Sequence, residues 1–226
     1  MSRENLLIVG CTSKIAREFI EAMTARYEIY GTYHVESPKN ISTKNSYKLD
    51  LSDNQSILNF IESVKPVAFS GVLFFASTYN EDPLNAKEYV KMFARDLQIN
   101  SFSQLTVAKF LTYAPDAKVF LFGDSGLQQP KKNFSSYSLS KAVLHSLVSI
   151  IAIELAERAK VLCFALGPTK PSASEMRKSE YFAQNAVQVD NPTSGLISYI
   201  TFLLQQDNLS MTGIEIPYDG GAYLIR

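Results

Sequence analysis

The chain has 226 residues, of which 46% are hydrophobic and 19% charged, a composition that supports a compact core and excludes disordered and fibrous classes. Its 22 basic and 22 acidic residues cancel to a formal net charge of +0, which leaves no global field to attract nucleic acid or an acidic membrane surface. The length predicts one domain over residues 1–226. With two distant cysteines, no leader-like segment and only short apolar runs, we expect a cytoplasmic protein without a membrane partner.

Short apolar runs alternate along the chain with longer stretches of helical periodicity, as in proteins that alternate strand and crossover helix. The pattern predicts strands at 6–9, 29–33, 47–49, 72–75, 119–122, 161–166 and 214–216. It predicts helices at 15–26, between Ser52 as a cap and Pro66, at 85–113 with room for one break, from Ser135 or Ser136 to Leu155, and at 193–206. We therefore predict an α/β fold, a three-layer, doubly wound, Rossmann-like domain with a parallel sheet of about seven strands.

The turn between the first strand and the first helix is a candidate phosphate site, because ligands of such sheets bind beyond the carboxyl ends of the strands. Backbone N–H groups and the dipole at a helix N-terminus favour an anion. A single glycine is also typical of an ordinary strand-to-helix turn, so the turn alone leaves both interpretations open. Its sequence is Gly10-Cys11-Thr12-Ser13-Lys14-Ile15-Ala16.

Tyr137 and Lys141 form a second candidate feature at the start of a predicted helix. Their spacing of four places both side chains on one helical face, with Cβ atoms roughly 5–6 Å apart. A nearby ammonium favours the phenolate and lowers a tyrosine pKa from about 10, so such a tyrosine can exchange a proton with an alcohol or carbonyl oxygen. Among 12 tyrosines this spacing also arises by chance. Only the position of the pair in the fold can therefore distinguish a catalytic pair from a chance spacing.

Over nearly its full length, and with its elements in the same order, the chain resembles the short-chain dehydrogenase/reductase family. Tyr137 and Lys141 match the family's catalytic Tyr-x-x-x-Lys motif, and Asn100 lies where the family has an asparagine that orders a proton-relay water. The resemblance implies a hydride transfer between a nicotinamide cofactor and a small carbonyl or alcohol substrate. Further matches are Asp50 and Leu51 at the pair that holds the adenine, Gly167, Pro168 and Thr169 at the segment that meets the nicotinamide carboxamide, and the C-terminal Thr212-Gly213 and Asp219-Gly220-Gly221.

The glycine-rich motif departs from the family pattern. The family has Thr-Gly-x-x-x-Gly-x-Gly, whereas this chain has Val9, Lys14 and Ala16 at the threonine and the later glycines. Lys14 could clash with the pyrophosphate or contact it, and we favour contact because its charge suits the ligand. After the fourth strand the family has Asn-Asn-Ala-Gly, whereas this chain has Phe74-Phe75-Ala76-Ser77. The residues expected to hold the nucleotide here are Gly10, Thr12, Ser13, Lys14, Ile15, Ala76 and Ser77.

The substrate-orienting serine of the family has two candidate counterparts. Counting back from Tyr137 without a gap places Asp124 there, whereas Ser125 aligns if one loop residue is deleted. We predict Ser125, because a hydroxyl can donate to a carbonyl oxygen and an ionised carboxylate would repel the developing oxyanion. An Asp124 turned toward the site would weaken the interpretation as a reductase.

The end of the second strand favours NADP over NAD. NAD enzymes of this layout place a carboxylate there, but this chain has Tyr33 and His34, with no acidic residue before Glu36. Lys14 and His34 are candidate partners of a 2′-phosphate. With 2 histidines and 2 cysteines in the chain, we predict no protein metal site.

A rival hypothesis is that the protein has this fold but little or no catalytic activity. The altered glycine turn is compatible with a catalytically weak protein that senses the cofactor or binds a partner, although the retained asparagine, tyrosine and lysine favour an enzyme. The resemblance places a substrate lid at 170–190, around Met176, Tyr181 and Phe182. It also implies a homodimer or homotetramer through the long helices that carry Phe93, Phe102, Leu147 and Ile151.

Overall fold

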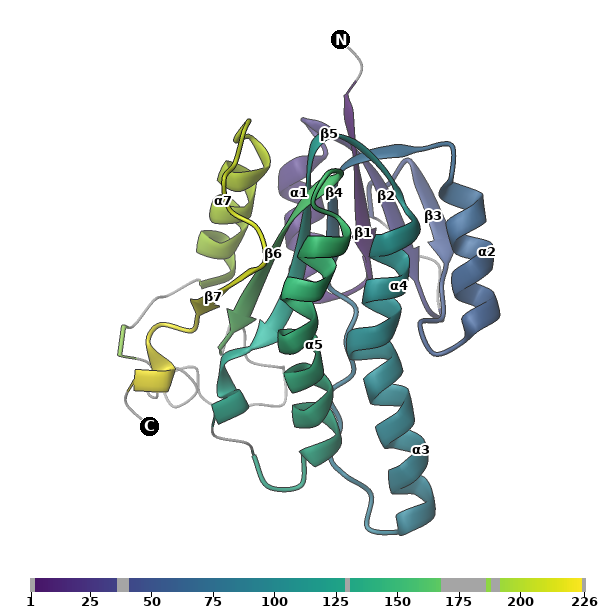
Figure 1. Ribbon diagram of the computed structural model, residues 1–226, viewed down its shortest axis with the longest axis vertical. Helices are drawn as coiled ribbons and strands as arrows, with labels where there is room; N and C mark the ends of the chain where they lie inside the picture. The colour runs from purple at the N-terminus through teal and green to yellow at the C-terminus, as the bar shows by residue number, and fades with distance from the viewer. Residues whose placement is uncertain (1–2, 36–40, 129–130, 168–185, 188–191, 225–226) are drawn as a thin grey trace.

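The computed structural model describes residues 3–35, 41–128, 131–167, 186–187 and 192–224. These residues form a seven-stranded sheet with the order β3-β2-β1-β4-β5-β6-β7, in which all neighbouring strands are parallel (Figure 1). The predicted doubly wound α/β fold is confirmed. The strands are β1 Glu4–Val9, β2 Tyr27–Tyr33, β3 Asn45–Lys48, β4 Ala68–Phe74, β5 Thr112–Asp124, β6 Ala159–Leu166 and β7 Ile214–Tyr218.

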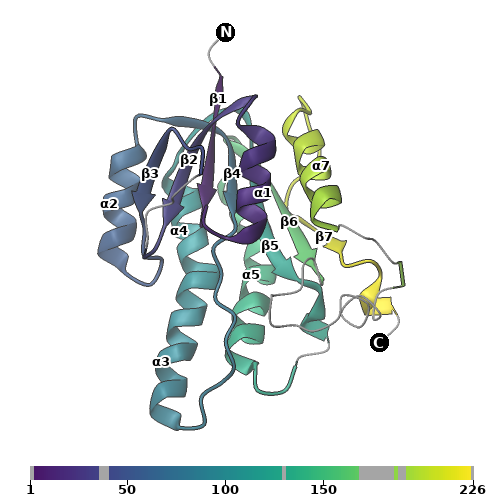
Figure 2. The ribbon, with the colours of Figure 1, turned by 180° about the vertical axis from the view of Figure 1, so that it is seen from behind.

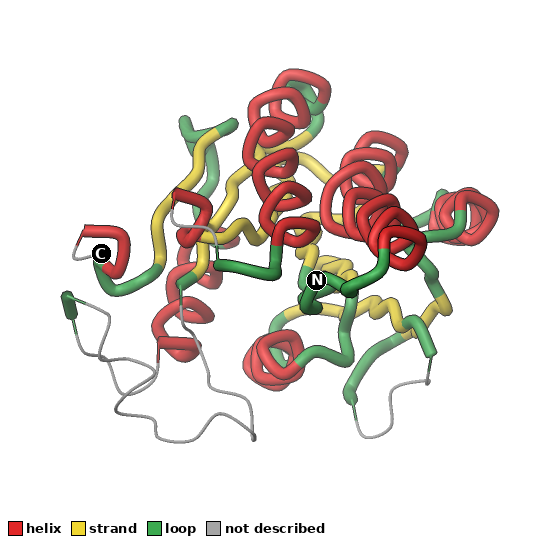
Figure 3. The backbone as a smooth tube through the Cα atoms, turned by 90° about the horizontal axis from the view of Figure 1, so that it is seen from below, coloured by secondary structure: helices red, strands yellow, loops and turns green. Residues whose placement is uncertain are grey.

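Helices cover both faces of the sheet, so the domain has three layers (Figures 2 and 3). Figure 2 shows α1 (Lys14–Met23) and α7 (Pro192–Leu204) in front of the sheet, where their apolar residues join one core cluster. The opposite face carries a second core cluster, because both faces of the central strands are buried. Its helices are α2 (Asn54–Val64), α3 (Ala86–Leu97), α4 (Ser103–Phe110) and α5 (Ser135–Glu154).

The strand order reverses at β1. This strand pairs with β2 on one side and with β4 on the other, and its residues 6–9 are fully buried, as the continuous apolar run predicts. The chain builds β2 and β3 outward from β1, then returns to build β4 to β7 on the other side. A crevice beyond the carboxyl ends of β1 and β4 is the expected ligand position in such a sheet.

The long predicted helix at 85–113 is interrupted and shorter than expected. A π-helical turn over Gln98–Phe102 separates α3 from α4, and the chain enters β5 already at Thr112. Such π turns are uncommon and frequently lie at functional sites. Asn100, which the resemblance places in the catalytic machinery, is buried at the centre of this turn.

Asp53, not Ser52, caps α2. The Asp53 carboxylate accepts hydrogen bonds from the backbone N–H groups of Gln55 and Ser56, whereas the Ser52 hydroxyl donates to Asp50 at 2.6 Å. Both residue types are good caps, so only the local geometry decides between neighbours.

Among the described helices, α5 has the length and composition of a membrane span, with a mean hydropathy of 1.4 over its most apolar window. In this fold 44% of that window is buried, and Leu144, Val148 and Ile151 belong to the core beneath the helix. This burial corrects the expected placement of Ile151, which faces the sheet and not a subunit interface. The exposed large apolar residues of α5 are Leu139, Ile150 and Ile153.

Candidate functional site

A cavity of about 260 Å³ opens beyond the carboxyl ends of β1, β2, β3 and β4, where the strand order reverses. Most of the residues predicted to hold a nucleotide lie together in its wall, although they come from four different strand ends. The predicted residues that line it are Gly10, Thr12, Ser13, Tyr33, His34, Asp50, Leu51, Ala76 and Ser77.

Gly10 shapes the turn that enters this cavity. Its φ of +84° lies in the left-handed region, and a Cβ atom there would meet the backbone nitrogen of Ala76 at 2.6 Å. Its N–H donates to the hydroxyl of Thr32, and the next N–H, of Cys11, donates to the Thr32 carbonyl. The one glycine that this turn retains is therefore the one that the close approach of β1 and the β4 loop requires.

The N-terminus of α1 faces this turn with two cations beside it. Ser13 caps the helix by accepting from the N–H of Ala16, and Lys14 follows as an exposed first helical residue. Arg17, one turn further on, donates through Nε to the carbonyl of Thr12. Lys14 and Ile15 do not line the cavity, so the lysine does not fill the space that the missing glycine leaves. The sequence analysis missed Arg17, although its position one helical turn after Ser13 is a usable signal.

His34 and Asp50 form an ion pair at the rim of the cavity. Nε2 of His34 lies 3.2 Å from Oδ2 of Asp50, while Oδ1 of Asp50 accepts from the N–H and the hydroxyl of Ser52. Burial by itself raises the pKa of Asp50, but the hydrogen bonds from Ser52 and the charge of His34 outweigh it and leave this pKa below its usual value.

Three further polar residues line the cavity that the sequence analysis did not single out for it. Arg95 projects from α3, and Thr32 and Thr78 come from β2 and from the loop after β4. Arg95 is exposed and adds a third cation to this edge of the sheet. No local motif marks it, because α3 reaches the cavity only through the tertiary fold.

Tyr137 and Lys141 lie next to one another on α5, as their spacing predicts. The ammonium of Lys141 is 6.0 Å from the centre of the Tyr137 ring. Lys141 is only 4% exposed, and its Nζ donates to the carbonyl of Phe122 in β5 at 2.8 Å. The Tyr137 hydroxyl donates to Oδ2 of Asp124 at 2.7 Å.

Asp124, not Ser125, contacts the tyrosine. Asp124 is the last residue of β5, and its Oδ1 accepts from the N–H of Gly126 at 2.6 Å, so the chain turns at once into a short 3₁₀ helix that begins at Ser125. This turn directs the carboxylate toward Tyr137. The placement differs from our preference for Ser125 and agrees with the alignment without a gap.

The electrostatics of the pair also differ from the expectation for a lysine-activated tyrosine. Burial raises the pKa of Tyr137, and the charge and hydrogen bond of Asp124 raise it further. Burial lowers the pKa of Lys141 to about 8, against an opposing effect of Asp124. The expected depression of the tyrosine pKa by Lys141 is absent, because a carboxylate rather than the ammonium contacts the phenol oxygen.

Asn100 connects the π turn to both halves of the site. Its Nδ2 donates to the Ser140 hydroxyl at 2.8 Å, and its Oδ1 accepts from the N–H of Thr78 at 2.9 Å and from the Ser77 hydroxyl at 3.0 Å. The side chain therefore ties the wall of the cavity to the helix that carries Tyr137. Its proton-relay role stays a prediction.

Two carboxylates from outside the predicted set hold the start of α5. Asp96 is 1% exposed and accepts from the hydroxyls of Thr78 and Ser136 at 2.7 and 2.6 Å. Asp82 accepts from the N–H groups of Ser135 and Ser136, so it caps the helix from a distant loop. The sequence carries no local signal for either role, since the partners lie 18 to 54 residues away.

Pro168 and Thr169 lie outside the described residues, as does the expected lid at 170–190 except for residues 186–187. Within the described part of the chain, no group of three or more histidine, cysteine, aspartate or glutamate side chains could hold a metal ion.

Comparison with solved structures decides which fold this is. A short chain dehydrogenase family protein from Francisella tularensis subsp. tularensis SCHU S4 superposes with a TM-score of 0.83 at 19% identity, over 99% of this chain and 100% of that one. The chain has the fold of the short-chain dehydrogenases. A Burkholderia cenocepacia J2315 short chain dehydrogenase in complex with NADP matches with a TM-score of 0.82 at 16% identity, over 97% of each chain. A blue fluorescent protein from a metagenomic library, in complex with NADPH, matches with a TM-score of 0.82 at 18% identity, over 97% of each chain.

The short-chain dehydrogenase fold accounts for the position of the cavity and of Tyr137 at the same edge of the sheet. No family model matches the sequence, and no curated protein matches it significantly. The fold is thus recognisable in three dimensions, while the sequence has diverged at the glycine turn and at Asp124.

Proposed function

We propose that this protein is an NADP-dependent oxidoreductase that transfers a hydride between the nicotinamide and a small substrate bound beside Tyr137. One observation carries the proposal: the cavity at the switch point and the Tyr137–Lys141 pair lie beyond the carboxyl ends of neighbouring strands of one sheet. Two structures of the same fold hold NADP or NADPH. The nicotinamide supplies the hydride chemistry, and the protein supplies binding and orientation.

The residues present suit such a nucleotide. The Gly10 turn leaves no Cβ in the crevice, and the N-terminus of α1 with Lys14 and Arg17 suits a pyrophosphate. Leu49, Leu51 and Ile99 provide apolar walls for an adenine. At the end of β2, His34 stands where NAD enzymes carry a carboxylate, and its imidazole can donate a hydrogen bond to a 2′-phosphate.

Around the reacting group, Tyr137 provides the hydroxyl, Lys141 a buried amine behind it, and Asn100 the link between the two halves of the site. The resemblance favours a carbonyl or alcohol as the reacting group. The carboxylate of Asp124 on the Tyr137 hydroxyl favours a different group, one that donates a hydrogen bond.

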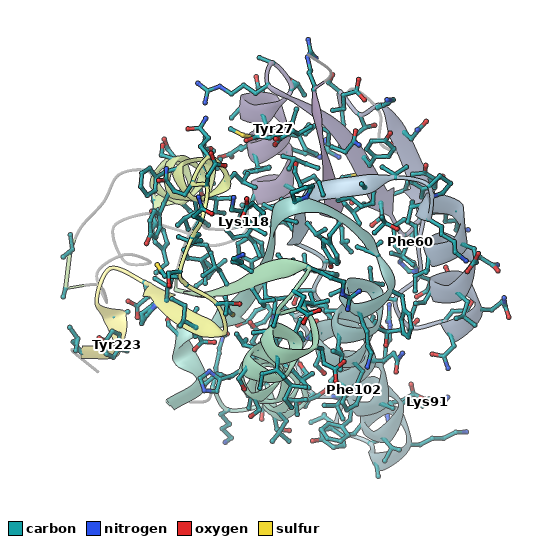
Figure 4. The ribbon with its side chains drawn as sticks, turned by 45° about the horizontal axis from the view of Figure 1, so that its top comes forward. Tyr27, Phe60, Lys91, Phe102, Lys118 and Tyr223 are labelled. Atoms are coloured by element: carbon teal, nitrogen blue, oxygen red, sulfur yellow. The ribbon has the colours of Figure 1, made fainter. Side chains whose placement is uncertain are left out.

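We also propose that two copies of the chain pair through α4 and α5. These neighbouring helices expose Phe110, Leu139, Ile150 and Ile153. The π turn before α4 adds the exposed Phe102, which Figure 4 shows on this helical layer. Large apolar side chains gathered on one helical face are typical of an interface. Leu147 and Phe93, named from the sequence, are only partly exposed there.

The test is a titration of the full chain with NADPH and NADH, followed by nicotinamide fluorescence, in the wild type and in Lys14→Ala and Tyr137→Phe. The proposal expects tight NADPH binding, weaker binding in Lys14→Ala and unchanged binding in Tyr137→Phe. It also expects that the wild type oxidises NADPH with a substrate. Absence of binding to either nucleotide contradicts the proposal.

The engagement of the Tyr137 proton by Asp124 favours one second candidate, a cofactor-sensing or partner-binding protein with weak catalysis or none. Such a protein binds NADPH without oxidising it at an appreciable rate. An enzyme of the proposed kind oxidises NADPH with a substrate.

A further inference from the structure

The single O–H donor of Tyr137 is already used in a hydrogen bond within this structure. A phenol carries one O–H donor, and here it points to Oδ2 of Asp124 at 2.7 Å. The other oxygen of Asp124 already accepts from the N–H of Gly126. A ligand that reaches this pair therefore meets a phenol oxygen and a carboxylate, and both offer it only lone pairs.

The carboxylate of Asp124 has no ion-pair partner among the described residues, since no lysine, arginine or histidine nitrogen of that part of the chain lies within 4.0 Å of it. The nearby Lys141 directs its ammonium to the carbonyl of Phe122 instead. Asp124 is only partly buried at the end of β5. A partly exposed anion beside the reacting position thus has no direct ion-pair partner in this part of the protein, and Lys141 acts on it only at longer range.

An aromatic wall stands beside the two acceptors. The ring of Tyr79 meets that of Tyr137 edge to face at a centroid distance of 4.7 Å, stacks on Phe134 at 4.8 Å, and is 57% exposed. Aromatic faces attract cations in addition to packing against apolar groups. The surroundings of Tyr137 therefore favour a ligand that is apolar in part and positively charged.

We propose that Asp124 binds a protonated nitrogen of the substrate, so that this site reduces an iminium carbon to an amine, or oxidises the amine in reverse. The proposal rests on the proposed function and names the substrate class of that same site. Asp124 is then a catalytic residue that touches the substrate, and Tyr137 accepts a second hydrogen bond or packs against it.

The chemistry balances without a proton from Tyr137. The iminium carbon accepts a hydride, with its electron pair, from NADPH. The π electrons of the carbon–nitrogen double bond become the lone pair of the nitrogen. The products are NADP⁺ and a neutral amine. The amine then takes a proton from water. A ketone needs a proton donor as its oxygen becomes an alkoxide, and the donor expected for that step is already bound to Asp124.

A ketone also fits the pair poorly. Its oxygen offers only lone pairs, which face the lone pairs of Asp124 and of the phenol oxygen. As hydride arrives, negative charge grows on that oxygen beside a carboxylate, whereas an iminium loses positive charge and ends as a neutral donor. Both the hydrogen-bonding and the charge patterns thus favour nitrogen.

The first experiment measures binding in the complex with NADP⁺, by calorimetry, of two probes that differ by one atom. The probes are 1,2,3,4-tetrahydroisoquinoline, a cation at neutral pH, and isochroman, in which an uncharged oxygen replaces the nitrogen. We expect the wild type to bind the amine at least about 10-fold more tightly, which corresponds to about 1.4 kcal/mol. In Asp124→Asn this preference disappears. Equal binding of the probes to the wild type, or an unchanged preference in Asp124→Asn, overturns the inference.

The second experiment compares the NADPH-dependent reduction of 3,4-dihydroisoquinoline with that of 1-tetralone, which places a ketone in a similar bicyclic frame. We expect the wild type to reduce the imine with a higher kcat/KM, and Asp124→Ser to shift the ratio at least about 10-fold toward the ketone. Ketone preference in the wild type overturns the inference. Asp124→Ser also serves as the second variant if Asp124→Asn folds poorly.

A titration with NADPH in the same samples separates the two proposals. If the wild type binds NADPH and prefers the ketone, only the role of Asp124 is contradicted. If the wild type does not bind NADPH, the proposed function itself is contradicted. If Asp124→Asn weakens NADP⁺ relative to NADPH and leaves the amine unaffected, the carboxylate serves the oxidised cofactor, and the substrate class inferred here is overturned.

Discussion

The carboxylate of Asp96 accepts a 2.6 Å hydrogen bond from the hydroxyl of Ser136, the residue immediately before Tyr137. Its other oxygen accepts from Thr78, whose backbone N–H in turn donates to Asn100. One buried anion in α3 thus fixes both the start of α5 and the loop that carries the cavity wall. Such a network stabilises the fold only while each member keeps its partners.

Replacing Asp96 with alanine should therefore destabilise the protein by roughly 1–3 kcal/mol, because the buried hydroxyl of Ser136 and the partly buried hydroxyl of Thr78 lose their acceptor. Urea unfolding at pH 7.5 measures this loss. Asp96→Asn retains one acceptor and should lose less. Glu88→Ala, at an exposed position of the same helix, is the matched control and should change the free energy of unfolding by less than about 0.5 kcal/mol. Equal effects of Asp96→Ala and Glu88→Ala would contradict the structural role of Asp96.

The buried amine of Lys141 should make stability depend on pH above neutrality. Its pKa is about 8 in the folded protein and 10.5 in the unfolded chain, so the unfolded chain binds more protons between these values. The free energy of unfolding therefore rises between about pH 8 and pH 10, by up to about 2 kcal/mol, and this contribution is lost as the pH falls through 8.

Urea unfolding of the wild type and of Lys141→Met at pH 7.5, 8.5 and 9.5 isolates the contribution of Lys141. The difference between the two proteins should grow with pH. Lys118, another buried lysine, also has a lowered pKa, and Lys118→Met serves as the comparison that leaves the site intact. Parallel pH profiles of the wild type and Lys141→Met would show that the amine does not titrate in this range.

Gly10→Ala should impair nucleotide binding as well as stability. The new Cβ would lie 2.6 Å from the backbone nitrogen of Ala76 at a φ of +84°, so the cavity wall must move. We expect a loss of about 1–3 kcal/mol in stability and weaker NADPH binding by fluorescence titration. Gly213→Ala imposes a similar left-handed strain, at φ +71° and outside the cavity lining, and should leave the NADPH affinity unchanged.

His34→Ala should weaken NADPH binding roughly 10-fold, since a charge-assisted hydrogen bond to the 2′-phosphate is lost, and should leave NADH binding within about 2-fold. Fluorescence titration with both nucleotides measures the ratio. His145→Ala removes the other histidine of the chain, which pairs with Glu215 away from the cavity, and should change neither affinity. An equal loss for NADPH and NADH would assign His34 to a role other than phosphate recognition.

Ile153→Glu should convert the proposed dimer to a monomer, because a charge placed in an apolar interface costs desolvation energy. Ile153 is 79% exposed in the single chain, so the change should leave the fold of the monomer intact. Light scattering gives the mass, and circular dichroism checks the fold. Leu84→Glu, at an exposed position in the loop before α3, is the control that should keep the dimer. A monomeric wild type would contradict the proposed pairing.

Much of this protein follows from the sequence because the relevant signals are local. The apolar run at 6–9 identifies a central strand, since only a strand covered on both faces buries four successive apolar side chains. The spacing of Tyr137 and Lys141 fixes their shared helical face by geometry alone. Gly10 marks the tight turn, because only glycine combines its φ with the close approach of Ala76.

The tertiary structure alone decides how the reacting group is surrounded. Asp124 faces Tyr137 because the chain turns sharply directly after it, and Lys141 donates instead to the carbonyl of Phe122 on the same strand. Asp96 reaches its two partners across 18 and 40 residues of sequence. A pKa depends on burial and on charges brought together by the whole fold, so no local pattern could show that burial and a carboxylate, and not the lysine, determine the pKa of Tyr137.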